Sequence, residues 1–476
     1  MRKFTLILTL VIITANSAVF AGSVDYLSNQ SAKFVMNPAS VARTEGADIA
    51  AYNPAGTAFF AEGLYFDVSN QMLFKSFEAK ENRTFGTFGL ENSFKQSEPT
   101  WFIPNLYAVY NFGQMGPGKL AAFLQAGIIA GEGKLKWGDG TIGSTGFILG
   151  NYSDIITEVN TQAGSSLLNP ASSPAGSTTS FEASSTYYAI GLGAAYSLLE
   201  DKISFALGMK YVMAKRTGKI NGAINVEIDP GTGTYVPLAV KIADEYECDA
   251  NGITPVFGFD AKPTKDLTIG LRYEMETKLN FKYKQKKRTA DSGDSTVDAG
   301  VAEALPNFGG LKAKQNLPAI LSFGAEQKIL PELTVGLAVT IFFMPEANID
   351  QIVNGQAVKT DGFGNAQETS LSVGYKVMPE LKLGLGIMYT NQNVRKDFVK
   401  NNAYLLATSA NPILDSLNVG LGATYEIMPG LDATLALNWE HYFPMSINAP
   451  FGAAGDLKVD YKKEVYGVSI GVAYKL

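Results

Sequence analysis

Apolar and polar residues alternate along most of the chain, and each alternating run stops at a turn. From Leu333 to Phe343, large apolar side chains occupy the odd positions, while threonine, glycine or alanine occupies most of the even ones. The same alternation recurs at 381–389, 417–427, 431–439 and 466–476. Because successive side chains of a strand point to opposite faces, the pattern predicts long β-strands with one apolar face and one face of small or polar residues.

Turn residues separate these runs and allow the strands to be counted. Pro331, Pro379 and Pro429 lie in three near-identical connections, where the fixed φ of proline favours a tight turn. With three looser relatives, the short turns lie at 112–120, 198–203, 262–267, 330–333, 378–381 and 428–431. Longer polar segments lie near 79–98, 138–182, 222–250, 284–316, 346–368, 392–414 and 445–463. Six short turns alternating with seven long loops require fourteen antiparallel strands, and bacterial outer-membrane barrels have even strand numbers.

The predicted strands are too long for an ordinary soluble sheet. We expect about 11–15 residues in each, whereas soluble strands have about 5–6 and a tilted membrane crossing needs about 9–11. A soluble β-sandwich or propeller would also alternate, but it does not need this length. The chain has no uninterrupted apolar stretch of the roughly 18 residues that a membrane helix requires. We therefore predict an all-β fold, a 14-stranded antiparallel transmembrane β-barrel over residues 63–476.

The excess of aromatic residues agrees with a barrel. The chain has 22 Tyr and 28 Phe, and aromatic side chains form girdles where a barrel meets the two membrane interfaces. The expected girdle includes Tyr389, Tyr425, Trp439, Tyr442, Phe443 and Tyr474. The final strand ends at Leu476, where such barrels usually have an aromatic residue. A terminal strand of this kind implies the outer-membrane barrel assembly machinery as a partner.

The first residues predict export. Arg2 and Lys3 precede an apolar run of about a dozen residues, and small residues suited to signal peptidase lie at Val19 and Ala21. The run is too short to span a bilayer, and no cysteine follows the cleavage point, which excludes a lipoprotein. Residues 1–21 are therefore expected to be a signal peptide, and the mature protein to lie in the bacterial outer membrane.

Residues 22–62 do not alternate. They are small and turn-prone, yet too apolar for a free tail, and the first strand begins on the short-turn side of the barrel. The segment is therefore expected to lie inside the lumen as a hatch, or plug. This divides the chain into a signal peptide (1–21), a hatch (22–62) and a transmembrane barrel (63–476).

Short motifs in the predicted hatch resemble a known family. They are Asn29, Gln30, Ser31 and Ala32, then Glu45 to Asp48, then Asn53, Pro54, Ala55 and Gly56. In their position after a signal peptide and before a fourteen-strand pattern, these motifs resemble the FadL family of outer-membrane transporters of long-chain fatty acids and other hydrophobic compounds. The motifs cover residues 29–56, and the strand count extends the resemblance over the whole chain.

The resemblance implies a mechanism as well as a fold. A long-chain fatty acid would bind in the barrel and leave sideways through the wall at a kinked third strand. Gly127, Gly131 and Gly133 lie on that strand, and strand glycines often mark bulges, although glycines are common on all the inward faces. Aromatic or alkane hydrocarbons are the alternative substrates. A non-specific porin or adhesin would need the N-terminal segment outside the lumen.

A plugged barrel offers no path for ions, so it must bind a solute and then move or bypass the plug. A fatty-acid carboxylate in the lumen would favour a cationic partner. By parity, Lys210 and Arg272 point inward and are the candidates. In the alternative interpretation, these cations neutralise inward acids such as Glu274, Glu276, Glu326 or Glu426.

Two loop segments are unusually apolar. Residues 154–159 and 297–305 have the pattern of short amphipathic helices. Their apolar side chains either offer an external capture groove for the substrate or pack on each other to close the barrel mouth.

Composition excludes several other functions. The net charge of −6 disfavours nucleic acid, and a single cysteine, Cys248, excludes internal disulfides and a cysteine metal cluster. The single histidine, His441, lies among girdle residues, so an enzyme is not expected. We expect no metal and no cofactor, and a monomer. Basic residues at 282–288 are expected to meet lipopolysaccharide phosphates or solvent rather than the substrate.

Overall fold

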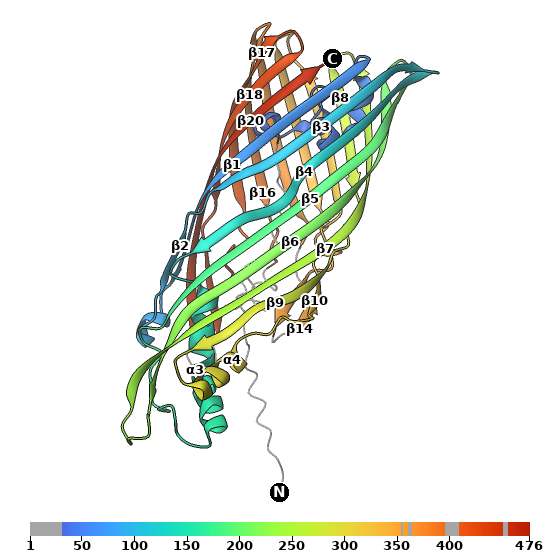
Figure 1. Cartoon of the computed structure of the whole chain (residues 1–476). Helices are drawn as coiled ribbons and strands as arrows, with labels where there is room; N and C mark the ends of the chain where they lie inside the picture. Colours follow the sequence, from blue (N-terminus) through green and yellow to red (C-terminus); the bar gives the residue numbers. More distant parts are fainter. Residues whose placement is uncertain (1–30, 354–355, 360–363, 396–408, 451–455) are drawn as a thin grey trace.

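The chain forms a closed antiparallel β-barrel in the computed structural model (Figure 1). The structure describes residues 31–353, 356–359, 364–395, 409–450 and 456–476. The predicted signal peptide and the motif residues Asn29 and Gln30 lie outside the described residues. Among the described helices, none is long and apolar enough to cross a membrane.

Fourteen strand positions make up the wall, which confirms the predicted number. In wall order they are β1 (Gly63–Glu81), β3 (Thr100–Met115) with β2 (Ser93–Gln96), β4 (Gly118–Trp137), β5 (Thr178–Leu198), β6 (Ile203–Ile228), β7 (Val236–Thr264), β8 (Leu267–Glu274) with β9 (Asn280–Asp291), β11 (Ile320–Lys328) with β10 (Lys312–Lys314), β12 (Leu333–Phe342), β15 (Ala366–Met378), β16 (Leu381–Asn391), β17 (Ser416–Met428), β18 (Leu431–Tyr442) with β19 (Met445–Pro450), and β20 (Asp456–Lys475). β13 (Asp350–Val353) and β14 (Gln356–Lys359) form a separate hairpin. The last strand, β20, pairs with β1 from Tyr65↔Lys475 to Glu81↔Val459 and so closes the barrel.

The two faces of the wall differ as the alternation predicts. On β18, Leu435 and Leu437 are exposed on the outside, whereas Ala436 between them is buried. The expected girdle residues Tyr389, Tyr425, Trp439, Phe443 and Tyr474 are exposed. The prediction for Tyr442 is wrong, because this residue has the inward parity of β18 and is 3% exposed. Its ring lies 4.0 Å from the ammonium of Lys463.

The predicted loop at 222–250 is wrong, because most of it is strand. β6 and β7 stay in register from Ile203↔Ala261 to Ile228↔Val236, and β7 has 29 residues, well beyond the 11–15 expected. Ile224, Val226, Val240 and Ile242 remain buried along the extension. The strands continue past the membrane because their inward side chains still find apolar partners.

Those partners are the two helices predicted in the apolar loops. α3 (Ile142–Ala163) and α4 (Ser295–Ala304) lie at the end of the barrel opposite the short turns (Figure 1). α3 begins much earlier than predicted, at a capping box formed by Thr141 and Ser144. Ile155 and Val159 of α3 pack with Val297 and Val301 of α4 in one buried cluster. Of the two alternatives, mutual packing is therefore the one observed.

The N-terminal segment, residues 31–62, lies inside the barrel at its other end (Figure 1). It contains α1 (Ala32–Met36), η3 (Ser40–Ala42), α2 (Ile49–Tyr52) and η4 (Pro54–Phe59). α1 contacts β16, β17, β18 and β20, η3 contacts β8, β11 and β12, and η4 contacts β4 to β7. The segment therefore meets the wall around most of its circumference.

Inward glycines make room for this segment. A Cβ at Gly270 would lie 2.2 Å from the carbonyl oxygen of Val41, and one at Gly420 would lie 1.9 Å from that of Val35. Only glycine allows a backbone to approach this closely. Part of the glycine content of the strands is thus explained by close contact between the wall and the N-terminal segment.

Candidate functional site

The Asn53–Gly56 motif attaches the N-terminal segment to the wall. The side-chain amide of Asn53 donates to the carbonyl oxygen of Val41 at 2.9 Å and to the carboxylate of Asp260 on β7 at 2.8 Å. Asn53 also caps η4, and Pro54 follows at a position where its missing N–H costs nothing. A Cβ at Gly56 would lie 2.8 Å from the carbonyl oxygen of Arg43. Asn53, Pro54 and Gly56 of the motif thus each have a local structural reason.

Ion pairs hold the same segment together. Asp48 is fully buried and accepts from Arg43 at 2.6 Å and from the hydroxyl of Ser31 at 2.5 Å. Ser31 also caps α1, and Ala32 is buried against the wall. The ammonium of Lys33 lies 3.0 Å from the carboxylate of Asp67 on β1. Buried charges are thereby paired, as burial requires.

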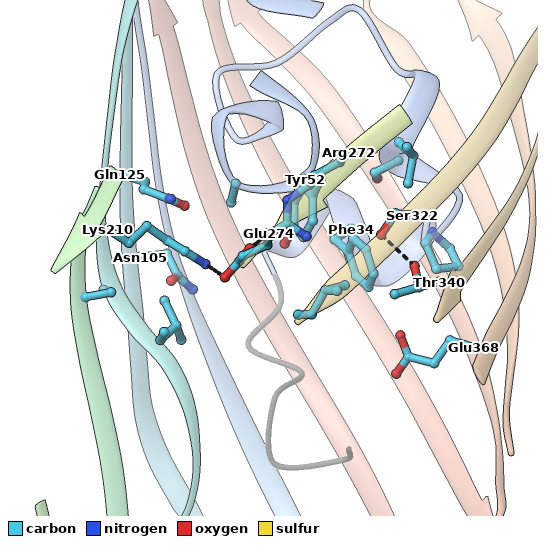
Figure 2. A pocket seen from close by; sticks show the side chains of 18 of the residues that line it. Phe34, Tyr52, Asn105, Gln125, Lys210, Arg272, Glu274, Ser322, Thr340 and Glu368 are labelled. Carbon is cyan, nitrogen blue, oxygen red and sulfur yellow. Dashed lines mark hydrogen bonds and ion pairs between the residues drawn. The ribbon is translucent and has the colours of Figure 1, made fainter. Parts of the chain in front are cut away.

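A cavity lies on the lumen side of this segment and encloses about 1200 Å³ of empty space, including its open mouth. Phe34 and Tyr52 belong to its lining, and their rings stack with centroids 4.4 Å apart. Burial raises the pKa of Tyr52 to about 12, so its phenol is neutral. The wall contributes apolar and polar side chains: Ile129, Leu317, Ile320, Phe342 and Met388, with Asn105, Gln125, Ser322, Thr340 and Glu368 (Figure 2). Mostly apolar walls with a few polar groups are typical of sites for hydrophobic ligands.

The two predicted cations meet in this cavity. Lys210 on β6 and Arg272 on β8 both donate to the carboxylate of Glu274, each to a different oxygen (Figure 2). The three side chains are almost completely buried. The neutralisation alternative is therefore observed, with Glu274 as the shared partner. A second carboxylate, Glu368, lies on the other side of the cavity.

The wall is interrupted beside the same cavity, at the third wall strand. β4 pairs with β3 as far as Asn105↔Gly127, and no pair between them follows among the described residues. The pairing of β4 with β5 continues, but its register shifts between Ile128 and Gly133. Gly131 and Gly133 have φ values of +114° and +66°, in the region that favours glycine. Gly127 lines the cavity, so the cavity reaches the interruption.

Lys75 on β1 bridges the interruption, and it is the residue that our sequence reasoning missed. Its ammonium donates to the carbonyl oxygens of Glu132 at 2.8 Å and Lys134 at 2.7 Å, both on β4. Lys75 lies where β1 changes partner, between Leu73↔Thr100 on β3 and Phe77↔Gln96 on β2. Its side chain is buried. The parity rule that selected Lys210 and Arg272 would have found this third inward cation.

Comparisons with known proteins agree with this architecture. A family model described as outer membrane protein transport protein (OMPP1/FadL/TodX) matches residues 160–476. Among solved structures, a Pseudomonas aeruginosa FadL homologue is 14% identical with a TM-score of 0.62, covering 94% of this chain and 99% of that chain. The P. putida toluene transporter TodX is 13% identical with a TM-score of 0.58, over 94% of this chain and 99% of that one.

The Ralstonia pickettii toluene transporter TbuX is also similar. It is 13% identical with a TM-score of 0.54, over 95% of this chain and 99% of that chain. At these identities the structures share the fold with this chain. No curated protein matches it.

Proposed function

The chain belongs to the OMPP1/FadL/TodX family of outer-membrane transport proteins for hydrophobic compounds, and on this premise we propose that its substrate is a long-chain fatty acid. We further propose that residues 22–62 are the hatch of the mature protein, that Lys210 and Arg272 bind the carboxylate, and that the substrate leaves through the wall beside Gly127, Gly131 and Gly133.

One observation carries the proposal: a single cavity touches all three features. Its floor is the N-terminal segment, Lys210 and Arg272 lie at one part of its wall, and Gly127 lies at another. A solute in the cavity meets the N-terminal segment below, which contacts the wall around most of its circumference. The interrupted wall is then the shorter way out.

Charge favours an acidic ligand. Lys210 and Arg272 share one carboxylate, so a ligand carboxylate would give the two cations a second anionic partner. Charge-assisted hydrogen bonds in a buried site are about twice as strong as neutral ones. The apolar lining around Phe342 and Met388 suits an alkyl chain.

The outer surface near the interruption favours lateral release. Trp101 and Phe102 of β3 are 53% and 78% exposed, and Phe74 of β1 packs edge-on against Trp101. Large apolar side chains at the lipid-facing rim lower the cost of moving an alkyl chain from the cavity into the bilayer.

An aromatic hydrocarbon is the second candidate substrate. Glu274 already engages both cations, so each cation keeps a carboxylate partner when an uncharged ligand is bound. TodX and TbuX are named as toluene transporters.

Binding measurements on the purified barrel separate these substrates. We expect Glu274→Gln to strengthen binding of oleic acid, because it removes the carboxylate that competes with the ligand. The triple variant Lys210→Met, Arg272→Met, Glu274→Gln should weaken oleic acid binding about tenfold or more and leave toluene binding unchanged. The triple change also avoids an unpaired buried charge, so it is a fairer test than removing the cations alone.

The result for toluene decides between the candidates. Equal effects of the triple variant on oleic acid and toluene would contradict a carboxylate role for Lys210 and Arg272. Toluene binding without measurable oleic acid binding would favour the hydrocarbon.

A further inference from the structure

Exposed lysines face each other across two strands on the outside of the barrel. Lys282 of β9 and Lys312 of β10 are direct cross-strand partners, and both are exposed, as are Lys278 and Lys314 nearby. Like charges directly opposite each other destabilise a strand pair. Lys282 also faces Asp249 on its other side, and a bound anion would compensate the remaining positive charge.

A groove accompanies these lysines. Lys278, Lys282 and Lys314 line it together with Asn251, Asn280 and Asn348. The groove forms where β7 changes partner, from β8 at Val256↔Glu274 to β9 at Asp249↔Lys282, so residues 275–279 are left between two ladders. Ammonium groups and side-chain amides around one hollow supply hydrogen-bond donors for an oxyanion.

The neighbouring lysines are already paired with carboxylates. Lys284 and Lys286 of β9 lie 3.2 Å from the carboxylates of Asp249 and Glu247. By contrast, no ion pair joins Lys278, Lys282, Lys312 or Lys314 to any carboxylate in the part of the chain that the structure describes. Asp249 also lines the groove but is shared with Lys284, so the groove keeps an excess of positive charge.

The level of the groove on the wall identifies the anion. On β7 the outward residues Phe257 and Ile253 are exposed and apolar, and Ile253 pairs with the exposed Tyr211 of β6. The next outward positions toward the long loops are Asn251 and Asp249. The groove thus begins where the apolar belt ends, on the side away from the short turns. In a bacterial outer membrane, this is the level of the phosphates of the outer-leaflet glycolipid.

We propose that this groove binds a phosphate group of lipid A, the phosphorylated glycolipid of the outer leaflet, with the acyl chains against Met275 and Leu271. Both of these side chains are exposed and precede Lys278 along the chain, toward the apolar belt. The bound lipid A would neutralise the Lys282–Lys312 pair and anchor the wall strands β9 and β10. This site is on the outside of the barrel and is independent of the cavity in the lumen.

The test uses the purified full-length barrel in detergent. Its affinity is measured by native mass spectrometry for bis-phosphorylated lipid A, for dephosphorylated lipid A and for lipid A in competition with inorganic phosphate. The variant Lys282→Gln, Lys312→Gln, Lys314→Gln should lose about a hundredfold in affinity for phosphorylated lipid A, roughly fivefold for each lysine. The matched control Lys134→Gln, Lys136→Gln removes two outward lysines of β4 that already lie near Glu182, and it should change little.

A second variant distinguishes the loss of positive charge from misfolding. Lys282→Arg, Lys312→Arg, Lys314→Arg keeps the charge and should keep most of the affinity. Equal affinities for phosphorylated and dephosphorylated lipid A would overturn the proposal, as would equal losses in the Gln variant and its control. If inorganic phosphate displaced bound lipid A as effectively as added lipid A does, the lipid would be rejected as the ligand. Oleic acid and toluene binding in the lumen serve as the folding check and should be unchanged.

Discussion

Two groups of wall strands differ: the continuous half, β15 to β18, has unbroken pairing, whereas the interrupted half, β1, β3 and β4, does not. From β15 to β18, neighbouring strands pair along their whole length, and the register shifts only beside the short turns. Around β1, β3 and β4, by contrast, β1 changes partner and β4 loses its pairing with β3 at Gly127. α1 lies against the continuous half, whereas the cavity reaches the interrupted half.

The two halves satisfy their backbone groups in different ways. In the continuous half, backbone pairs with backbone. In the interrupted half, side chains take over: Lys75 donates to two carbonyl groups of β4, and Asn70 of β1 bonds the backbone of Trp101 and Ile103 at 3.0 Å. Every backbone group inside a membrane needs a partner. A side chain can leave by rotating, without breaking a ladder, which supports the proposed exit through the interrupted half.

The largest effect should come from removing the N-terminal segment, the proposed hatch. Deleting residues 31–60 should raise the ion conductance of the reconstituted barrel by about tenfold or more, because the emptied lumen becomes an aqueous channel. Conductance is measured in planar bilayers, and heat-modifiable migration on gels verifies that the barrel has formed. A high conductance already present in the intact protein would show that the N-terminal segment does not seal the lumen.

The next effect tests the interruption itself. In Gly131→Ala, the new Cβ would lie 2.4 Å from the carbonyl oxygen of Ser185, at a φ of +114°. Strain of this kind costs about 1–3 kcal/mol, so β4 should change its register near the cavity. We expect uptake into liposomes to fall by roughly tenfold, with ligand binding retained.

Gly233→Ala is the matched control for this change. Gly233 also has a positive φ, +75°, but an added Cβ would have no atom within 4 Å. It lies in the turn between β6 and β7, far from the interruption along the chain. If both variants lose uptake equally, backbone strain in general is responsible, and the wall at Gly131 has no special role.

The continuous half was the part most open to prediction from sequence. Strands such as β16 and β18 have strict alternation between short, proline-marked turns, so the inward or outward direction of each side chain follows from its parity. The same rule placed Lys210 and Arg272 inward correctly. Among the expected girdle residues the prediction is wrong at Tyr442, which adjoins Trp439 and Phe443 in the sequence but has inward parity.

The interrupted half was predictable only in outline. Glycines on β4 indicated an irregular strand, but alternation does not say which carbonyl groups lose their partners or that Lys75 reaches them from β1, more than fifty residues earlier in the chain. Likewise, parity put Glu274 in the lumen without showing that it joins both cations. These contacts depend on the stagger between strands, which a single sequence does not encode locally. The long β6–β7 extension was missed because its outward face is polar, as in a loop.

A smaller effect is expected from removing the bridge across the interruption. Lys75→Met takes away two charge-assisted hydrogen bonds, each of about 1.5–3 kcal/mol, and leaves two carbonyl groups of β4 without that partner. The free energy of unfolding should fall by about 3 kcal/mol, and bound ligand should leave the cavity about fivefold faster, as followed by stopped-flow fluorescence.

Lys463→Met provides the comparison for Lys75. Lys463 is also a buried, inward lysine, but its ammonium donates to Asn411 at 2.9 Å, and the Asn411 amide in turn donates to the side chain of Glu132 on β4. Its loss should lower stability without faster release. Faster release in both variants would mean that lumen charge, not the bridge, controls the exit.

The smallest effect lies at the exposed contact between the N-terminal segment and the continuous half. Lys382 of β16 pairs with Glu45 and, as the largest influence, lowers the pKa of Glu45 from 4.5 to about 2. The side chains are 34% and 63% exposed, so solvent screening limits the pair to less than about 1 kcal/mol. Because the pKa is lowered in the folded state, the contribution is complete above about pH 4.5 and disappears as the pH falls toward 2.

Hydrogen exchange of the amides at 46–52 measures this contribution. Lys382→Met should exchange slightly faster than the unmodified protein at pH 5, and the difference should vanish near pH 2. Arg43→Met, which strands the buried carboxylate of Asp48, should accelerate exchange far more at pH 5, since breaking a buried pair costs about 3–5 kcal/mol. If Lys382→Met accelerated exchange as much as Arg43→Met, the N-terminal segment would be held by the exposed Lys382–Glu45 pair rather than by its buried contacts.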